Sequence, residues 1–185
     1  MFLNIPNILT FSRIIMIPII ILLSLFENTN LNFLIFFIFI YCGITDFLDG
    51  FIARKKDQIT LIGKLMDPIA DKILTVSVLL VLIYVGIIDD LLFIAAFLII
   101  FREFLISGLR EFLSSFNQAL PVNKLGKIKT MIQFISLGML LLAYASNIKI
   151  IFHIGSLFLW LTALLTIISG ILYMNMGFNI IKKLK

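Results

Sequence analysis

The chain has 185 residues, of which 62% are hydrophobic and 14% are charged, and its mean hydropathy is +1.17. A soluble helical bundle needs polar outer faces, and long stretches of this chain have almost none, which excludes a soluble domain and indicates an integral membrane protein. The formal net charge is +5, but the basic residues flank apolar segments, so anionic lipid and phosphorylated substrates suit them better than nucleic acid.

Six apolar segments follow one another with short connections, and we expect each to form a transmembrane helix of a single domain over residues 1–185. Each approaches or exceeds the roughly 20 residues that a helix needs to cross about 30 Å of hydrocarbon. Strands are not expected, because an open sheet edge cannot be left in lipid. The predicted fold class is therefore all-α and polytopic, with spans at about 8–26, 33–53, 63–88, 91–112, 128–145 and 150–181.

A short polar stretch, Asn4 to Arg13, leads into the first segment. Pro6 is tolerated in a first helical turn, and Asn4 or Asn7 can cap that turn. Asn7, Thr10 and Arg13 recur every three residues and give the helix a polar edge. Two interpretations stay open here. One is a short interfacial N-terminal helical segment that lies on the bilayer before the first span, and the other is an edge that faces a functional site and contacts a phosphate or a nucleotide.

Four of the ten acidic residues lie where the second segment ends and the third begins. Asp46 and Asp49 are three residues apart, Asp67 and Asp71 are four apart, and each pair therefore shares one helix face. Antiparallel packing would bring the two pairs together, where they would repel one another unless a divalent cation lay between them. We therefore expect a site for Mg²⁺, Mn²⁺ or Ca²⁺, hard ions that prefer oxygen ligands, with room for two ions.

Other residues near the aspartates suit the same ligand. Gly50 lets a bulky ligand or a helix approach the backbone, and Arg54, about one turn later, can bind a phosphate through two hydrogen bonds. Thr60 offers a hydroxyl group to that ligand. Gly63 and Pro68 fit the start of the third helix, where proline costs least.

Basic residues gather at the ends of the fourth and fifth segments, and the set comprises Arg102, Arg110, Lys127 and Lys129. They indicate either a phosphorylated substrate or the ordinary positive charge of cytoplasmic loops. Arg102 lies deep enough in its segment that a purely topological role is inadequate. Of the fifteen Lys and Arg residues only Lys149 lies at the opposite side, so both termini and the four aspartates are expected at the cytoplasmic face of the inner membrane.

The aspartates belong to the pattern Asp46-x2-Asp49-Gly50-x2-Ala53-Arg54-x8-Gly63-x3-Asp67-x3-Asp71, which resembles the signature of the CDP-alcohol phosphatidyltransferases at every defined position. The resemblance runs from Pro6-Asn7-x2-Thr10-x2-Arg13 to the last segment. Further stretches are similar to the bacterial members that use glycerol 3-phosphate, namely residues 4–10, 101–104, 108–111 and 126–130.

The resemblance implies transfer of the phosphatidyl group from CDP-diacylglycerol to the C1 hydroxyl of sn-glycerol 3-phosphate, which gives phosphatidylglycerol phosphate and CMP. It implies two ions of Mg²⁺ or Mn²⁺ and a homodimer surrounded by membrane phospholipid. The four aspartates would hold the ions, and Asp71 would also deprotonate the attacking hydroxyl. The residues implied for CDP-diacylglycerol are Asn7, Thr10, Arg13, Gly50, Arg54 and Thr60, and those for the acceptor are Arg102, Arg110, Lys127 and Lys129.

Two alternatives remain at the level of the sequence. The same chemistry can use another acceptor, inositol phosphate or phosphatidylglycerol, whereas the basic cluster argues against serine and choline. A divalent cation transporter is disfavoured because its carboxylates would lie near the bilayer centre, often within internal repeats, and here they lie at one end and no repeat is found.

Overall fold

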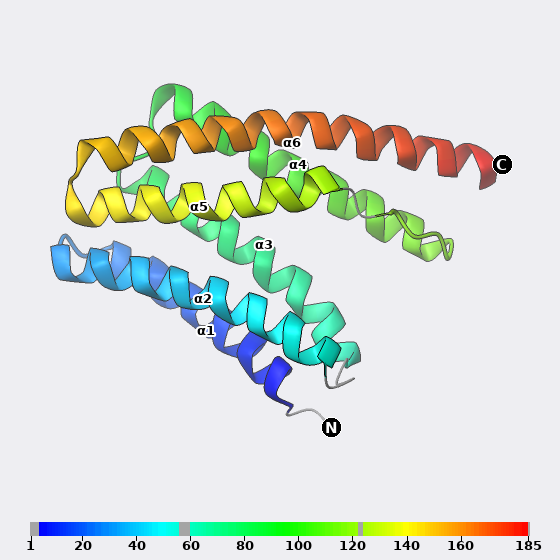
Figure 1. Ribbon diagram of the computed structural model, residues 1–185, viewed down its shortest axis with the longest axis horizontal. Helices are drawn as coiled ribbons and strands as arrows, with labels where there is room; N and C mark the ends of the chain where they lie inside the picture. Colours follow the sequence, from blue (N-terminus) through cyan, green and yellow to red (C-terminus); the bar gives the residue numbers. More distant parts are fainter. Residues whose placement is uncertain (1–3, 56–59, 122–123, 185) are drawn as a thin grey trace. The chain divides into compact units, whose positions relative to one another are not determined.

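The computed structural model describes residues 4–55, 60–121 and 124–184, apart from some side chains within these ranges, and in them it contains helices and no strand (Figure 1). Every predicted apolar segment is helical, which confirms the all-α fold class. The predicted boundaries differ from the observed ones by a few residues. The helices are α1 (Ile5–Ser24), α2 (Thr29–Lys55), α3 (Leu61–Tyr84), α4 (Asp90–Ser115), α5 (Lys124–Ser146) and α6 (Lys149–Leu184).

Local sequence explains where α1 and α3 begin. The Asn4 side chain caps α1 by accepting a hydrogen bond from the Asn7 amide at 3.0 Å, and Pro6 lies in the first turn, which needs no N–H from it. Thr60 caps α3 in the same way, accepting from the Gly63 amide at 3.0 Å. From Ile5 to Ser24 α1 is one unbroken helix, so the polar stretch is continuous with the first apolar segment.

Pro68 differs from its predicted place, because it lies inside α3 rather than in its first turn. A proline has no N–H group to donate to the carbonyl four residues before it, so this turn of α3 lacks one hydrogen bond. The missing bond falls immediately after Asp67, on the helix that carries two of the four aspartates.

Within the described residues, five helices are long and apolar enough to cross a membrane, namely α1, α2, α4, α5 and α6. The third helix is the exception because Lys64, Asp67, Asp71 and Lys72 all lie in its first half. Its uncharged remainder, residues 73–84, is about 18 Å long at 1.5 Å per residue, short of the hydrocarbon thickness of about 30 Å. The chain is therefore a multi-pass membrane protein.

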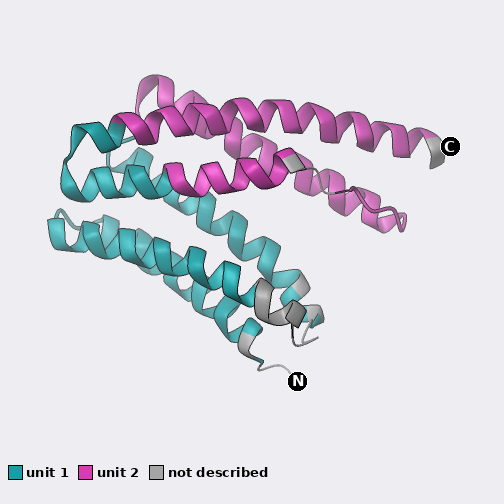
Figure 2. Ribbon diagram, in the orientation of Figure 1, with its two compact units in different colours: residues 1–88, 137–152 teal, residues 89–136, 153–185 magenta. Residues whose placement is uncertain are grey.

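The chain divides into two compact units, shown in Figure 2. The first consists of residues 1–88 and 137–152, and in it α1 packs against both α2 and α3. The second consists of residues 89–136 and 153–185, which hold α4, the first half of α5 and most of α6. Ile106, Leu113, Leu120 and Tyr173 form a buried cluster in this second unit.

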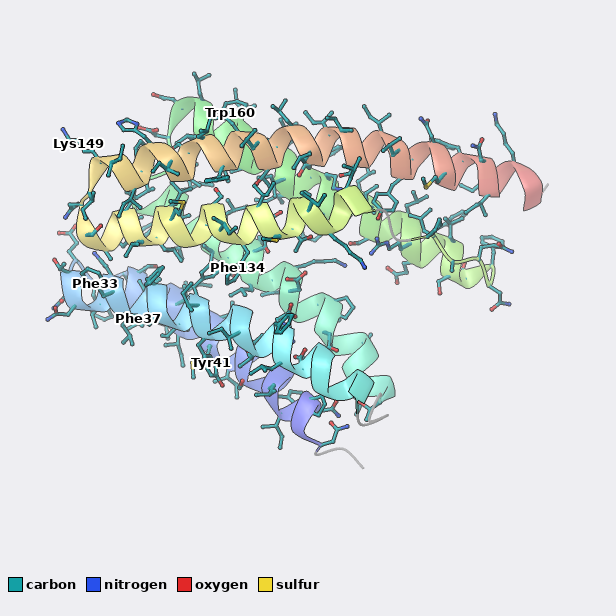
Figure 3. All side chains as sticks on the ribbon, in the orientation of Figure 1. Phe33, Phe37, Tyr41, Phe134, Lys149 and Trp160 are labelled. Carbon is teal, nitrogen blue, oxygen red and sulfur yellow. The ribbon has the colours of Figure 1, made fainter. Side chains whose placement is uncertain are left out.

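One row of aromatic residues on α2 gives the first unit an apolar patch. Phe33, Phe37 and Tyr41 follow one another at intervals of four residues along α2 (Figure 3). Phe37 is 61% exposed and Tyr41 is 41% exposed. Such a row of exposed aromatic rings would be an aggregation hazard in water and is suited to lipid.

Candidate active site

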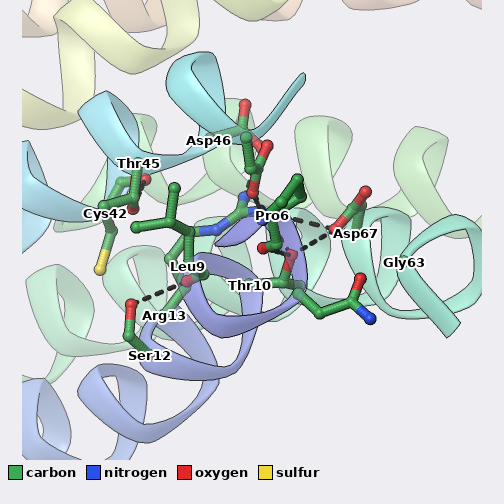
Figure 4. A network of polar contacts seen from close by, with 12 residues as sticks. Pro6, Leu9, Thr10, Ser12, Arg13, Cys42, Thr45, Asp46, Gly63 and Asp67 are labelled. Carbon is green, nitrogen blue, oxygen red and sulfur yellow. Dashed lines mark hydrogen bonds and ion pairs between the residues drawn. The ribbon is translucent and has the colours of Figure 1, made fainter. Parts of the chain in front are cut away.

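The polar edge of α1 faces the aspartates of α2 and α3. Arg13 is fully buried, and its guanidinium group donates from Nη1 to Asp46 Oδ1 and from Nη2 to Asp49 Oδ2. The same Nη2 lies 3.8 Å from Asp67 Oδ1 on α3. Figure 4 shows Arg13, Asp46 and Asp67 meeting from α1, α2 and α3. The structure therefore brings three of the four predicted aspartates together around one cationic side chain.

Thr10 and Asn7 extend this network along α1. The Thr10 hydroxyl lies 2.6 Å from Asp67 Oδ1 and 3.3 Å from Asp49 Oδ2, so its single proton can be donated to one of them at a time. The Thr60 hydroxyl donates to Asn7 Oδ1 at 2.9 Å while it also caps α3. The polar edge is thus bound to both neighbouring helices, which supports the second of the two interpretations offered for it.

Gly63 permits the contact between α1 and the start of α3. A Cβ atom at this position would lie 3.0 Å from Asn7 Oδ1 and 3.2 Å from Thr60 Oγ1, tighter than nearly all real contacts. Any other residue would push apart the hydroxyl and amide that join the two helices. This gives a steric reason for the glycine in the sequence pattern.

The donor chemistry of the aspartates suits a hard divalent cation, although their present arrangement is organised around Arg13. Among the described residues, no group of three His, Cys, Asp or Glu side chains is arranged to hold a metal ion. Three carboxylates against one guanidinium group nevertheless leave a formal charge of −2. The side chains of Asp46 and Asp67 are 49% and 44% exposed, so oxygen ligands remain accessible to an ion from solution.

Asp71 lies on α3 one turn beyond Asp67, with its side chain exposed. Its position on the same helix face agrees with the predicted pairing of these two residues. Gly50 and Arg54 belong to the last turns of α2, but their side-chain positions lie outside the described part of the structure. Their predicted roles in ligand binding therefore remain predictions.

A second group of charged residues lies in the other unit, around Glu103 on α4. Its Oε1 accepts from Lys129 Nζ of α5 and from Arg102 Nη1, the latter at 3.4 Å. Arg102 also donates from Nη2 to the Ser169 hydroxyl of α6 at 3.3 Å. Lys129 is fully buried in spite of its charge, which its ion pair with Glu103 explains.

Tyr173 of α6, which was not predicted as a site residue, joins Arg110 to this group. The guanidinium carbons of Arg102 and Arg110 each lie 5.4 Å from the centre of the Tyr173 ring. Three of the four predicted acceptor residues are thus brought together. Lys127 is exposed and stands two residues before Lys129, so the two lysines point to different sides of α5.

The fold and the two charged clusters define the class of the protein as a multi-pass membrane enzyme, with an acidic cluster in the first unit and a basic cluster in the second. Residues 3–168 match the sequence profile of CDP-alcohol phosphatidyltransferase. The chain belongs to the CDP-alcohol phosphatidyltransferase family. Enzymes of this family generally depend on a divalent metal ion.

Proteins from several bacteria are similar to this chain over nearly its whole length. A protein of Rickettsia typhi is 44% identical over 171 residues, which cover 92% of this chain and 94% of the relative. A protein of Bacillus subtilis is 34% identical, and the match covers 97% of this chain and 97% of the relative. A protein of Haemophilus influenzae is 36% identical, and the match covers 94% of this chain and 93% of the relative. All three are named CDP-diacylglycerol–glycerol-3-phosphate 3-phosphatidyltransferase.

Proposed function

We propose that this protein transfers the phosphatidyl group of CDP-diacylglycerol to sn-glycerol 3-phosphate and releases phosphatidylglycerol phosphate and CMP. The observation that carries the proposal is the meeting of Thr10, Arg13 and three signature aspartates from three helices of an apolar bundle. The names of relatives that match more than nine-tenths of the chain support the choice of acceptor.

A pair of divalent ions, Mg²⁺ or Mn²⁺, would be held by the four signature aspartates, Asp46, Asp49, Asp67 and Asp71. When bound, such ions stabilise negative charge on the pyrophosphate of the donor and on the departing CMP. The other residues of this unit contribute binding. In the proposal Asn7, Thr10 and Thr60 contact the nucleotide and its phosphates with Gly50 and Arg54, and Arg13 balances the negative charge of the aspartates.

The chemical step needs a base and a bound acceptor. Asp71 takes the proton of the C1 hydroxyl of glycerol 3-phosphate as that oxygen attacks the phosphorus attached to diacylglycerol. A new P–O bond forms to the acceptor, the P–O bond to CMP breaks, and CMP leaves with its own phosphate. Arg102 and Arg110 of α4, together with Lys127 and Lys129 of α5, bind the phosphate already present on the acceptor.

The same proposal includes the placement of the chain in the membrane. We place all six helices across the bilayer in one domain over residues 1–185; α3 crosses over its full 24 residues, with its charged first half in the active site and not in lipid. Both termini and the active site lie at the cytoplasmic face of the inner membrane. The first turn of α1 lies at the interface. Two copies form a homodimer, and the exposed apolar side chains outside that contact face phospholipid.

The decisive experiment compares acceptors. Purified protein in detergent is supplied with CDP-diacylglycerol, Mg²⁺ or Mn²⁺, and one radiolabelled acceptor at a time: glycerol 3-phosphate, inositol phosphate, phosphatidylglycerol, serine or choline. We expect CMP release and a labelled lipid with glycerol 3-phosphate alone. Turnover with another acceptor, and none with glycerol 3-phosphate, would replace the proposed substrate, and failure with every acceptor would reject the proposed activity.

A further inference from the structure

Tyr173 is a buried aromatic residue that lies against two cationic side chains. It is 1% exposed, and its ring centre is 5.4 Å from the guanidinium carbon of Arg102 and 5.4 Å from that of Arg110. At this distance the negative face of a tyrosine ring attracts a cation, and the attraction strengthens where water is excluded. The two arginines lie eight residues apart on α4, so one ring on α6 serves both.

Three glycines leave room for the close packing of α4, α5 and α6 around the Tyr173 ring. A Cβ atom at Gly170 would lie 3.3 Å from Arg102 Cγ, and one at Gly177 would lie 2.7 Å from Leu109 Cδ2. These two residues stand one turn to either side of Tyr173 on α6 and allow α4 to approach. Gly126 of α5 makes room for the tyrosine hydroxyl, since a Cβ atom there would lie 3.1 Å from it.

The two arginines have different surroundings. Arg102 is bound to Glu103 and to the Ser169 hydroxyl, and its side chain is 13% exposed. Arg110 is exposed, so its guanidinium group is accessible to a ligand from solution. Arg102 is therefore a fixed inner charge and Arg110 an accessible one, with the Tyr173 ring in contact with both.

The charges of the cluster suit a dianion. Arg102, Arg110 and Lys129 against Glu103 carry a net formal charge of +2. Two guanidinium groups near one ring repel each other, and a phosphate accepting hydrogen bonds from them relieves that repulsion. A phosphate monoester such as that of the acceptor carries nearly two negative charges at neutral pH.

We infer that Tyr173 is a positioning residue for the acceptor, because its ring fixes the separation and orientation of Arg102 and Arg110 for the phosphate of glycerol 3-phosphate. The inference rests on the proposed function. Because its ring acts through the two arginines, we expect Tyr173 to affect acceptor affinity and to leave the chemical step unchanged.

Steady-state kinetics of the full-length protein in detergent micelles provide the test. Tyr173→Phe keeps the ring, and we expect its KM for glycerol 3-phosphate to stay within about twofold of the unsubstituted protein. Tyr173→Leu removes both cation–ring contacts, and we expect that KM to rise about tenfold. The kcat and the KM for CDP-diacylglycerol are expected to change less than about twofold in both variants. The matched control is Tyr84→Leu, the same replacement at a tyrosine that is 65% exposed.

A graded series separates positioning from folding. Phenylalanine analogues with one, two and three ring fluorines in place of Tyr173 change its shape little but weaken the attraction of the ring for cations step by step. We expect the KM for glycerol 3-phosphate to rise with each fluorine. A flat series, or a Tyr173→Leu variant that behaves like Tyr84→Leu, would overturn the inference while the unsubstituted protein still turns over. Absence of turnover in the unsubstituted protein would instead reject the proposed function.

Discussion

Charged side chains are tolerated inside an apolar bundle when a partner offsets the loss of water. Arg13 and Asp49 are both buried and meet this condition together, whereas Asp46 and Asp67 are half-exposed and keep part of their hydration. The ion pairs of Arg13 therefore stabilise the protein mainly through Asp49. The remaining negative charge of the cluster is available to a metal ion.

Replacing Arg13 by Gln tests whether its ion pair with Asp49 stabilises the protein while the other aspartates remain available to a metal ion. The variant leaves Asp49 buried without its counter-charge, and breaking a buried ion pair costs about 3 kcal/mol. In EDTA we expect Tm to fall by several degrees. Addition of Mn²⁺ is expected to raise Tm more in the variant than in the unsubstituted protein, because Arg13 no longer competes for the carboxylates. Arg13→Lys is the control that keeps the charge. Equal Tm values in EDTA would contradict the assignment.

Asp71→Asn tests the proposed base. An amide neither accepts the proton of the acceptor hydroxyl nor carries the charge of a metal ligand, so we expect kcat to fall about 100-fold or more. CDP-diacylglycerol binding is expected to be largely retained, because Asp46, Asp49 and Asp67 remain. CMP release and equilibrium binding of the donor measure the two effects. Asp89→Asn, at the residue directly before α4, serves as the control. Equal losses of kcat in both variants would contradict the role of Asp71.

Residue spacing predicted which side chains share a face but not how those faces meet. Arg13 was expected beside a nucleotide or phosphate, and the structure shows it among the aspartates themselves. Spacing along one helix fixes only the direction of a side chain around that helix. The rotation of α1 against α2 and α3 depends on packing over their whole length, and it decides which carboxylates Arg13 reaches.

At the scale of elements, the contact between α1 and the start of α3 depends on Gly63, because a glycine has no side chain. Gly63→Ala places a methyl group within 3.0 Å of Asn7 Oδ1 and 3.2 Å of Thr60 Oγ1. We expect a loss of about 1–3 kcal/mol in unfolding free energy, together with weaker CDP-diacylglycerol binding, because the cap and the link to Asn7 must both shift. Thermal unfolding and donor binding measure these losses.

Gly108→Ala is the matched control for Gly63→Ala. Both glycines are helical, but a Cβ atom at Gly108 meets nothing within 4 Å. We expect this variant to be as stable as the unsubstituted protein or slightly more so, because alanine favours a helix more than glycine does. Comparable destabilisation by the two replacements would show that the tight contacts around Gly63 are not the cause.

The helices of the described residues were predictable because each apolar run is long, and Asn4 was one of the two expected caps of the first. That Thr60 caps α3 was not predicted, since its hydroxyl was assigned only to the ligand. The inward-facing side of α6 was not predicted, although the sequence contains a signal for it. Thr162, Thr166, Ser169 and Tyr173 are spaced by four, three and four residues, and all are buried. Polar side chains at that spacing in an apolar span mark the inward face of the helix. The contacts of Ser169 and Tyr173 with the arginines of α4 could not be predicted from the spacing.

At the scale of the whole molecule, the distribution of basic residues predicts the orientation. All Lys and Arg residues except Lys149 lie at one side of the proposed spans, and loops rich in these residues stay in the cytoplasm. The same side carries the signature aspartates. This agrees with the proposed substrates, because a soluble phosphorylated acceptor and a nucleotide leaving group are then exchanged with the cytoplasm and need not cross the bilayer.

Two cysteine substitutions, each introduced into the protein that keeps Cys42, test this orientation. Asn30 and Gln118 are both exposed, the first near the start of α2 and the second after α4, and the native Cys42 is buried. In intact cells we expect a membrane-impermeant maleimide to label the Asn30→Cys variant, because the connection between α1 and α2 faces outward. The Gln118→Cys variant is expected to react only after the membrane is permeabilised. Labelling in the opposite order would invert the topology and would place the carboxylates of α2 and α3 on the outer face, away from cytoplasmic glycerol 3-phosphate.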